Sequence, residues 1–123
     1  MFADTSASSG FAVPEVGAAR HFYGETLDIR TSEEHGLMTL HLAGGRDTIV
    51  YPKPDHQPAA YTILNFVVDD IDGAVDELVR RGVTIERYDG FKQDEKGIFR
   101  EEGPYIAWFK DPAGNILAVL QQR

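Results

Sequence analysis

The sequence "WFKDPAGNILAVLQQR", residues 108–123, has the pattern of a β-hairpin. Apolar residues stand on both sides of "DPAGN", where proline presets one backbone angle and the Gly-Asn pair tolerates positive φ. We therefore predict two antiparallel strands, within "PYIAWFKD" (104–111) and "NILAVLQQ" (115–122). Ala118 stands at the centre of the second strand, where an acidic residue would indicate catalytic chemistry. The hairpin is therefore expected to form the wall of a binding pocket.

The residues before this hairpin predict a strand, a helix and a further strand. "YTILNFVV" (61–68) is rich in β-branched and aromatic residues, as strands are. Asp69 and Asp70 then offer side-chain oxygens to cap a helix. Apolar residues follow at helical spacing, and Gly82 suits the left-handed position that ends a helix. With "VTIERY" (83–88) as the next strand, the order is β-α-β-β-β.

A weaker copy of the same pattern lies earlier in the chain. "FAVPEVGAARHFY" begins at Phe11 and "FVVDDIDGAVDEL" begins at Phe66, an offset of 55 residues (66 minus 11). We predict an α+β fold with two tandem βαβββ modules, at about 6–54 and 60–122, within a single domain that spans 1–123. The expected elements of the first module are a strand within 6–13, a helix with Val16, Ala19, Phe22 and Tyr23 on one face, a strand within 27–34 and a hairpin over 37–54 that turns at Gly44 and Gly45. Residues 55–60, "DHQPAA", are expected to link the modules.

Composition excludes several classes of function. The formal net charge of −8 disfavours nucleic-acid binding, because phosphate backbones repel an acidic surface. The chain has no cysteine, which excludes disulfides, thiolate catalysis and cysteine-based zinc sites. No stretch is long and apolar enough for a membrane span, and the first residues do not resemble a signal peptide. We expect a cytoplasmic protein without a membrane partner.

Three segments together resemble the vicinal oxygen chelate superfamily, which includes glyoxalase I, extradiol dioxygenases, fosfomycin-resistance enzymes and bleomycin-binding resistance proteins. They are "ARHFYGETLDI" (19–29), "VDDIDGAVDELVRRGV" (68–83) and "FKDPAGNILAVLQ" (109–121). The resemblance extends from about residue 11 to residue 121. It implies a concave mixed sheet built from the two modules, with helices on the outer faces. It also implies a homodimer with a small-molecule ligand as partner.

The resemblance further implies where a metal ion would bind in the metalloenzyme members. Their ligands, a His in each module and a Glu on the final strand, correspond here to Ser8, Ile63 and Ala118. Isoleucine and alanine have no ligating atom, and a neutral serine hydroxyl is a poor ligand for zinc or a hard divalent ion. Shifting the register of the last two strands by one residue brings no ligand either. We expect no metal and no other cofactor.

Strand alternation gives the candidate ligand-binding residues. If Ala118 and Ile63 face the cavity, Tyr61 and Asn65 share that face. The resemblance to fosfomycin-resistance proteins places Trp108 inside, beside Ile106. His41 faces the cavity if Met38, Leu40 and Leu42 pack under the helix. The full set of predicted ligand-binding residues is Ser8, His41, Tyr61, Ile63, Asn65, Ile106, Trp108 and Ala118.

Two features leave alternatives open. His41 is either a polar residue at the rim of the cavity or a weak candidate for proton transfer, since imidazole titrates near neutral pH. The segment 86–103 carries Tyr88, Phe91 and Phe99 and is either a functional lid or rim, or a solvated loop.

Three hypotheses of function follow. The first is a metal-free protein that binds a small aromatic or antibiotic-like molecule in an apolar cavity. The second is a lyase, isomerase or dioxygenase-type enzyme of the same superfamily, with an atypical metal site or His41 as acid-base catalyst. The third is a dimerisation or regulatory module.

Overall fold

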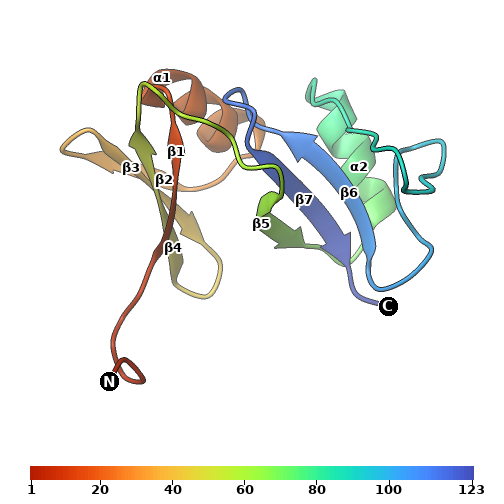
Figure 1. The fold of residues 1–123 in the computed structure, drawn as a ribbon, viewed down its shortest axis with the longest axis horizontal. Coiled ribbons are helices and arrows are strands. Elements are labelled where there is room, and N and C mark those ends of the chain that lie inside the picture. Colours follow the sequence, from red (N-terminus) through yellow and green to blue (C-terminus); the bar gives the residue numbers. More distant parts are fainter. The chain divides into compact units, whose positions relative to one another are not determined.

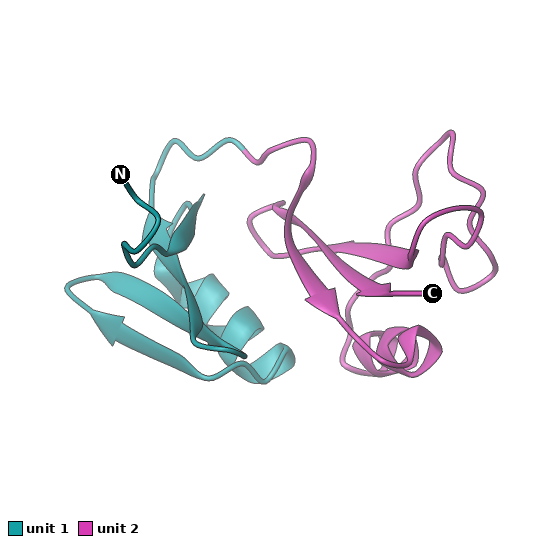
Figure 2. Cartoon of the chain, turned by 90° about the horizontal axis from the view of Figure 1, so that it is seen from below, with its two compact units in different colours: residues 1–57 teal, residues 58–123 magenta.

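The computed structural model describes residues 1–123, and tertiary contacts divide the chain into two compact units, Met1–Gln57 and Pro58–Arg123. The boundary falls within residues 55–60, which the sequence assigns to the linker. Each unit has its own β-sheet and its own helix, shown in two colours in Figure 2 and labelled in Figure 1. Neither α-helix has the length and hydrophobicity required to cross a lipid bilayer.

The first unit contains a four-stranded mixed sheet in the order β1-β4-β3-β2 (Figure 1). Strand β1 is parallel to β4, and the other neighbours are antiparallel. Its elements are β1 (Ser9–Val13), α1 (Val16–Ala19), η1 (Arg20–Thr26), β2 (Thr31–Glu34), β3 (Leu37–Leu42) and β4 (Arg46–Pro52). The hairpin between β3 and β4 turns at Gly44 and Gly45, both with positive φ, as predicted.

One face of this sheet is buried under the helical segment. Met38, Leu40 and Val50 are fully buried on that face, because alternate residues of a strand point to the same side. The ring of Phe11 lies 5.6 Å from the buried ring of Tyr23 in η1. The predicted helix thus exists and buries Ala19, Phe22 and Tyr23, but α1 spans one turn and continues as a π-helix, which the pattern did not indicate.

The second unit contains a three-stranded mixed sheet in the order β5-β7-β6. Strand β5 is parallel to β7, and β6 is antiparallel to β7. Its elements are β5 (Thr62–Val67), α2 (Ile71–Arg80), β6 (Tyr105–Lys110) and β7 (Ile116–Gln121). Asp70 caps α2 by accepting a hydrogen bond from the Gly73 amide at 3.1 Å, and Gly82 follows the helix with φ 88°. Both helix boundaries therefore agree with the sequence.

The internal repeat is confirmed by the local structure. Glu15 and Asp70, which are 55 residues apart, are the N-cap residues of α1 and α2, and both carboxylates accept amide hydrogen bonds of the first turn. In both units the first strand of the module is parallel to the last. The predicted α+β class is confirmed, with one mixed sheet in each module.

One predicted strand is absent, and two predicted strand boundaries are wrong. Residues 83–88 form only an isolated bridge, between Glu86 and Trp108, because the chain leaves the edge of β6 after this pair. Strand β1 begins at Ser9, so Ser8 lies just before it and is exposed. Of the segment 27–34, only Thr31–Glu34 is a strand.

The turn that decides the hairpin is held by one buried carboxylate. Asp111 is 4% exposed and accepts hydrogen bonds from the amides of Ala113 at 2.9 Å and Asn115 at 2.8 Å. The side-chain amide of Asn115 donates to the second carboxylate oxygen at 2.9 Å. The predicted turn at 111–115 is confirmed, and its Asp and Asn stabilise each other's position.

Candidate functional site

The sheet of the second unit has one face covered by α2 and one open face, on which Asn65 and Val67 are exposed while Ala118 is fully buried. Ala107 and Phe109 are buried at 0% and 1% exposure on the helix side, together with Leu117 and Val119 of β7. The register aligns Asn65, Ala118 and Trp108 across the three strands on the other side. Val67, Leu120 and Ile106 form the next row on that open face.

Four of the predicted ligand residues therefore lie on one face: Asn65, Ala118, Trp108 and Ile106. Ile63 lies at an irregularity of β5, because Thr62 pairs with Ile116 and Leu64 already pairs with Leu117. Because β5 has an extra residue here, the alternation of side chains between the two faces of the sheet is interrupted, and Tyr61 cannot be assigned to the face of Asn65 by counting residues. Tyr61 precedes the strand and is 70% exposed.

An aromatic cluster surrounds Trp108. The centroid of its ring lies 5.6 Å from Tyr88, 5.1 Å from Phe91 and 6.3 Å from Phe99. These separations are typical of aromatic pairs that attract each other through edge-to-face and tilted contacts. Phe91 is also 5.3 Å from Phe99 and remains 48% exposed. The segment 86–103 thus presents aromatic surface beside the open face of the sheet.

Backbone pairing along β6 fixes this segment. Glu86 bridges to Trp108 and Phe99 bridges to Ile106, so these residues share a side of the sheet with their partners. Inside the segment, the Gln93 side chain supplies backbone hydrogen bonds that a neighbouring strand would otherwise provide. It accepts from the Tyr88 amide at 2.9 Å and donates to the carbonyls of Glu86 and Gly97 at 3.0 and 2.7 Å.

Ion pairs also connect the segment 86–103 to α2. Arg100 donates to Asp94 at 3.0 Å and to Asp72 of α2 at 2.8 Å. The hydrogen bond from Arg100 lowers the pKa of the Asp72 carboxyl below its ordinary value, and the nearby Lys96 ammonium lowers it further. The two carboxylates in turn raise the pKa of Arg100. The segment 86–103 is therefore attached to the unit in two places, to β6 by backbone bridges and to α2 by ion pairs.

The Tyr88 hydroxyl is the unusual polar group of the aromatic cluster. Its oxygen is buried and has no hydrogen-bond partner. Burial raises the pKa of this phenol, and the nearby negative charge of Glu86 raises it further, so the group is a protonated donor. A buried hydroxyl without a partner is rare in folded proteins, so this donor requires an explanation.

The two remaining predicted residues belong to the first unit. His41 lies on the face of β3 opposite the buried Met38 and Leu40, as alternation predicts. Its Nε2 lies 2.7 Å from the Ser32 hydroxyl and its Nδ1 lies 3.2 Å from a carboxylate oxygen of Asp47. Ser8 precedes β1 and is exposed.

The donor atoms at the family's metal positions do not fit a metal ion. Ser8 is outside its strand, Ile63 lies at the irregularity of β5, and Ala118 is fully buried without a ligating atom. No three histidine, aspartate or glutamate side chains gather elsewhere in the structure to hold an ion. We therefore derive no metal-dependent step for this chain.

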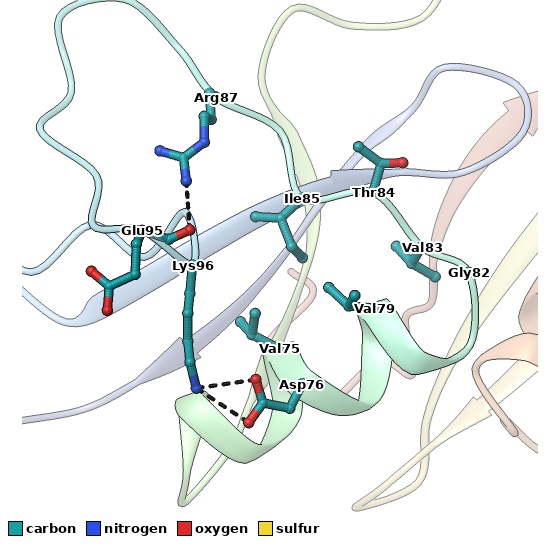
Figure 3. Close-up of a pocket in the computed structure, with 10 residues that line it drawn as sticks. All are labelled: Val75, Asp76, Val79, Gly82, Val83, Thr84, Ile85, Arg87, Glu95 and Lys96. Atoms are coloured by element: carbon teal, nitrogen blue, oxygen red, sulfur yellow. Dashed lines mark hydrogen bonds and ion pairs between the residues drawn. The ribbon is translucent and has the colours of Figure 1, made fainter.

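A hollow lies on the helix side of the second unit, between α2 and the segment that follows it (Figure 3). Its volume is about 630 Å³, but none of the eight predicted ligand residues lines it. Lys96 is bonded to Asp76 at 3.0 Å, and Arg87 donates to the Glu95 carbonyl at 2.9 Å. Val75, Val79, Val83 and Ile85 form its apolar wall. Because it has no aromatic side chain and its lysine is already paired, we favour the aromatic face as the ligand site.

Sequence reasoning missed the partners of His41. Asp47 is directly opposite His41 in the β3–β4 hairpin, a pairing that the Gly44-Gly45 turn could have indicated. Ser32 could not be identified as a partner of His41 in this way, because the distance between the two side chains depends on the register of β2 against β3. Composition alone made Tyr88, Phe91 and Phe99 candidates for a lid or rim. Their position beside Trp108 depends on the backbone bridges between the segment 86–103 and β6, which the sequence does not reveal.

Comparison with known proteins agrees with the fold. The model of the Glyoxalase/Bleomycin resistance protein/Dioxygenase superfamily matches residues 7–119. No curated protein sequence matches the chain significantly. Among solved structures, TnmS3, an antibiotic binding protein from Streptomyces sp. CB03234, shares 25% sequence identity over 98% of each chain, with a TM-score of 0.70.

Two more distant structures share the fold alone. The fosfomycin resistance protein FosX from Mesorhizobium loti is 12% identical over 98% of this chain and 93% of its own, with a TM-score of 0.67. A glyoxalase/dioxygenase from Nostoc punctiforme is 14% identical over 93% of this chain and 88% of its own, with a TM-score of 0.65.

Proposed function

Because the chain belongs to the Glyoxalase/Bleomycin resistance protein/Dioxygenase superfamily, we propose that it binds a small, flat aromatic molecule on the open face of the second unit, without a metal ion. The observation that carries this proposal is the convergence of Tyr88, Phe91 and Phe99 on Trp108. Exposed aromatic surface beside apolar strand residues suits an organic ring, which gains free energy by leaving water and by stacking.

The polar groups of this face narrow the ligand class. The unpaired Tyr88 hydroxyl requires a hydrogen-bond acceptor, such as a ring carbonyl or ether oxygen. Glu86 pairs with Trp108 through its backbone, and its carboxylate lies 3.9 Å from the Lys110 ammonium, which is therefore not free to bind an anion. The expected ligand is therefore an uncharged aromatic ketone or a related compound. The similarity of this chain to TnmS3, an antibiotic binding protein, supports an antibiotic-like molecule of this kind as the ligand.

The test is a binding screen with fused-ring aromatic compounds, read by thermal shift and confirmed by equilibrium dialysis. A ligand raises the apparent stability of the protein by mass action. We expect Trp108→Ala to weaken a confirmed ligand by ~1–3 kcal/mol, and Trp108→Phe to retain most of the affinity because a ring remains. Phe2→Ala, which alters an exposed aromatic residue of the first unit, is the matched control and should bind as the wild type does.

Two results would count against the proposal. If Trp108→Ala folds with the wild-type circular dichroism spectrum and binds the ligand unchanged, the aromatic cluster is not the site. Stoichiometric zinc, manganese, iron or nickel in untagged purified protein, lost together with an activity on chelation, would restore the metalloenzyme hypothesis. Elemental analysis of the purified protein decides this second point.

The assembly and location of the protein are part of the same proposal. We propose a cytoplasmic homodimer, because closed symmetric dimers are the commonest oligomers and the related family commonly forms them. Multi-angle light scattering at micromolar concentration is the test. A mass of 13.7 kDa, that of one chain, would refute the dimer.

A further inference from the structure

Ser32, His41 and Asp47 of the first unit have the mutual geometry of a nucleophile, a base and an orienting acid. The Ser32 hydroxyl lies 2.7 Å from His41 Nε2, and His41 Nδ1 lies 3.2 Å from a carboxylate oxygen of Asp47. Both distances are within the range found between such groups. The three residues stand on β2, β3 and the start of β4, on the sheet face opposite the buried Met38 and Leu40.

One arrangement of protons satisfies all three groups. An ionised Asp47 is only an acceptor, so His41 Nδ1 donates its proton to it. In the neutral imidazole Nε2 is then an acceptor, and Ser32 donates its hydroxyl proton to it. His21 and His35, by contrast, each contact one carboxylate, Glu25 and Glu34 respectively. His41 thus differs from these two histidines in that it contacts both a hydroxyl and a carboxylate, all on the exposed surface of the sheet.

We propose that these three residues form a second, catalytic site that hydrolyses small, uncharged esters. Ser32 Oγ attacks the ester carbon while His41 Nε2 takes the hydroxyl proton, and Asp47 holds the imidazole in the required tautomer. The C–O bond to the alcohol then breaks, and the alcohol leaves with the proton from Nε2. Water, deprotonated by Nε2, attacks the acyl-serine and releases the carboxylic acid, and Ser32 recovers its proton. The balance requires only ester and water.

The edge position of β2 supplies a donor for the developing oxyanion. His41 donates its amide to the Arg30 carbonyl at 2.8 Å, and Ser32 pairs with Thr39. Because hydrogen-bonded and non-hydrogen-bonded pairs alternate in an antiparallel ladder, the amide of Glu33 points away from β3. β2 is the terminal strand of its sheet, so this amide, next after Ser32, is directed out of the sheet edge. An amide at that position is a common oxyanion donor in serine hydrolases.

The surroundings select the substrate class. Ile49 and Tyr51 share the face of β4 with Asp47, and Tyr51 is 40% exposed, so an alkyl or aryl group of the ester has apolar surface beside the site. Glu33 and Glu34 follow Ser32, and the chain has a net charge of −8. A negatively charged ester is repelled by this environment, and a neutral one is not.

The experiment uses the full chain with an alkyl fluorophosphonate probe, which reacts covalently with activated serines, and with p-nitrophenyl acetate. Intact-mass and peptide analysis should locate one adduct on Ser32. Ser32→Ala should remove the adduct, and His41→Gln should slow both labelling and ester hydrolysis by about 100-fold or more. Asp47→Asn should slow both reactions as well, because the imidazole loses the acceptor that fixes its tautomer.

Two matched variants separate this site from unspecific surface reactivity. Ser9→Ala removes a hydroxyl that is bonded only to a threonine, and His21→Gln removes an imidazole beside a carboxylate. Both should label and hydrolyse at wild-type rates. Folding of every variant is checked by circular dichroism. Absence of an adduct on Ser32 in the folded wild type would overturn the proposal, and so would ester hydrolysis in Ser32→Ala at the wild-type rate.

Discussion

The unpaired hydroxyl of Tyr88 leads to an unusual prediction, namely that one substitution stabilises the free protein and weakens its ligand. The hydroxyl oxygen is buried without a hydrogen-bond partner, while the ring packs at 5.6 Å against Trp108. Tyr88→Phe removes the hydroxyl and keeps the ring. The free protein then no longer carries an unsatisfied buried donor, which costs ~1–3 kcal/mol when it has no partner.

We expect Tyr88→Phe to raise the free energy of unfolding by about 1 kcal/mol, the low end of this range, because the residue is only half-buried and water reaches part of the ring. For a chain of this size that corresponds to about 3–6 °C in melting temperature. Urea denaturation followed by circular dichroism measures the change. Tyr51→Phe is the control: its ring is 40% exposed, so its stability should change by less than ~0.5 kcal/mol.

Ligand binding should change in the opposite direction. A fused aromatic ketone such as 9-fluorenone should bind Tyr88→Phe about tenfold more weakly, since its carbonyl loses one hydrogen bond of ~1.4 kcal/mol. Fluorene, which lacks the carbonyl, should bind both proteins equally. If Tyr88→Phe lowers the stability of the free protein, the hydroxyl has a partner within the chain and the assignment of Tyr88 as ligand donor is wrong.

Further predictions concern the elements that hold the site. Asp111→Ala removes the acceptor of three hydrogen bonds in the β6–β7 turn and should lower the free energy of unfolding in urea by about 3–5 kcal/mol, and a loss below ~1 kcal/mol would contradict this role. Gly97→Ala should cost about 1–3 kcal/mol, because φ is +89° and the new Cβ would stand 2.6 Å from Ile85, and a neutral effect would show that the turn relaxes. The hydrogen bond from Arg100 lowers the pKa of Asp72 in the folded protein below its ordinary value of 3.8. The pair therefore stabilises the fold fully above pH 3.8, and this stabilisation is lost as the pH falls through the lower pKa of the folded state. Arg100→Ala should therefore reduce the loss of melting temperature on acidification, and an unchanged pH profile would show that the pair contributes nothing.

The features that sequence predicted well are set by local chemistry. The N-cap of α2 depends on Asp70 and the amide three residues later, and its end depends on the positive φ of Gly82. The β6–β7 turn depends on Asp111 and Asn115, which lie four residues apart. Interactions of this range are visible in a short window of sequence, because the partners are close in the chain whatever the rest of the fold does.

The features that sequence missed depend on register between distant segments. The segment 83–88 has the composition of a strand, yet it pairs with β6 only at Glu86, and the Gln93 side chain bonds the Glu86 carbonyl and the Tyr88 amide instead. The extra residue of β5 near Ile63 shifts the alternation that had linked Tyr61 to Asn65. Neither effect leaves a local signal, since both arise from how a strand meets its neighbour.

The repeat relates the two candidate sites to each other. Gly10 and Asn65 are 55 residues apart and begin equivalent rows across the two sheets. One row continues through Ile49 to Thr39, and the other continues through Ala118 to Trp108. Beyond Thr39 the first row reaches Ser32, and beyond Trp108 the second reaches Glu86. The backbone scaffold is thus the same, while one open face carries hydroxyl groups and an imidazole and the other carries aromatic rings. Since function resides in side chains placed on a fold, the two faces are expected to act on different molecules, and variants of either face should leave the chemistry of the other intact.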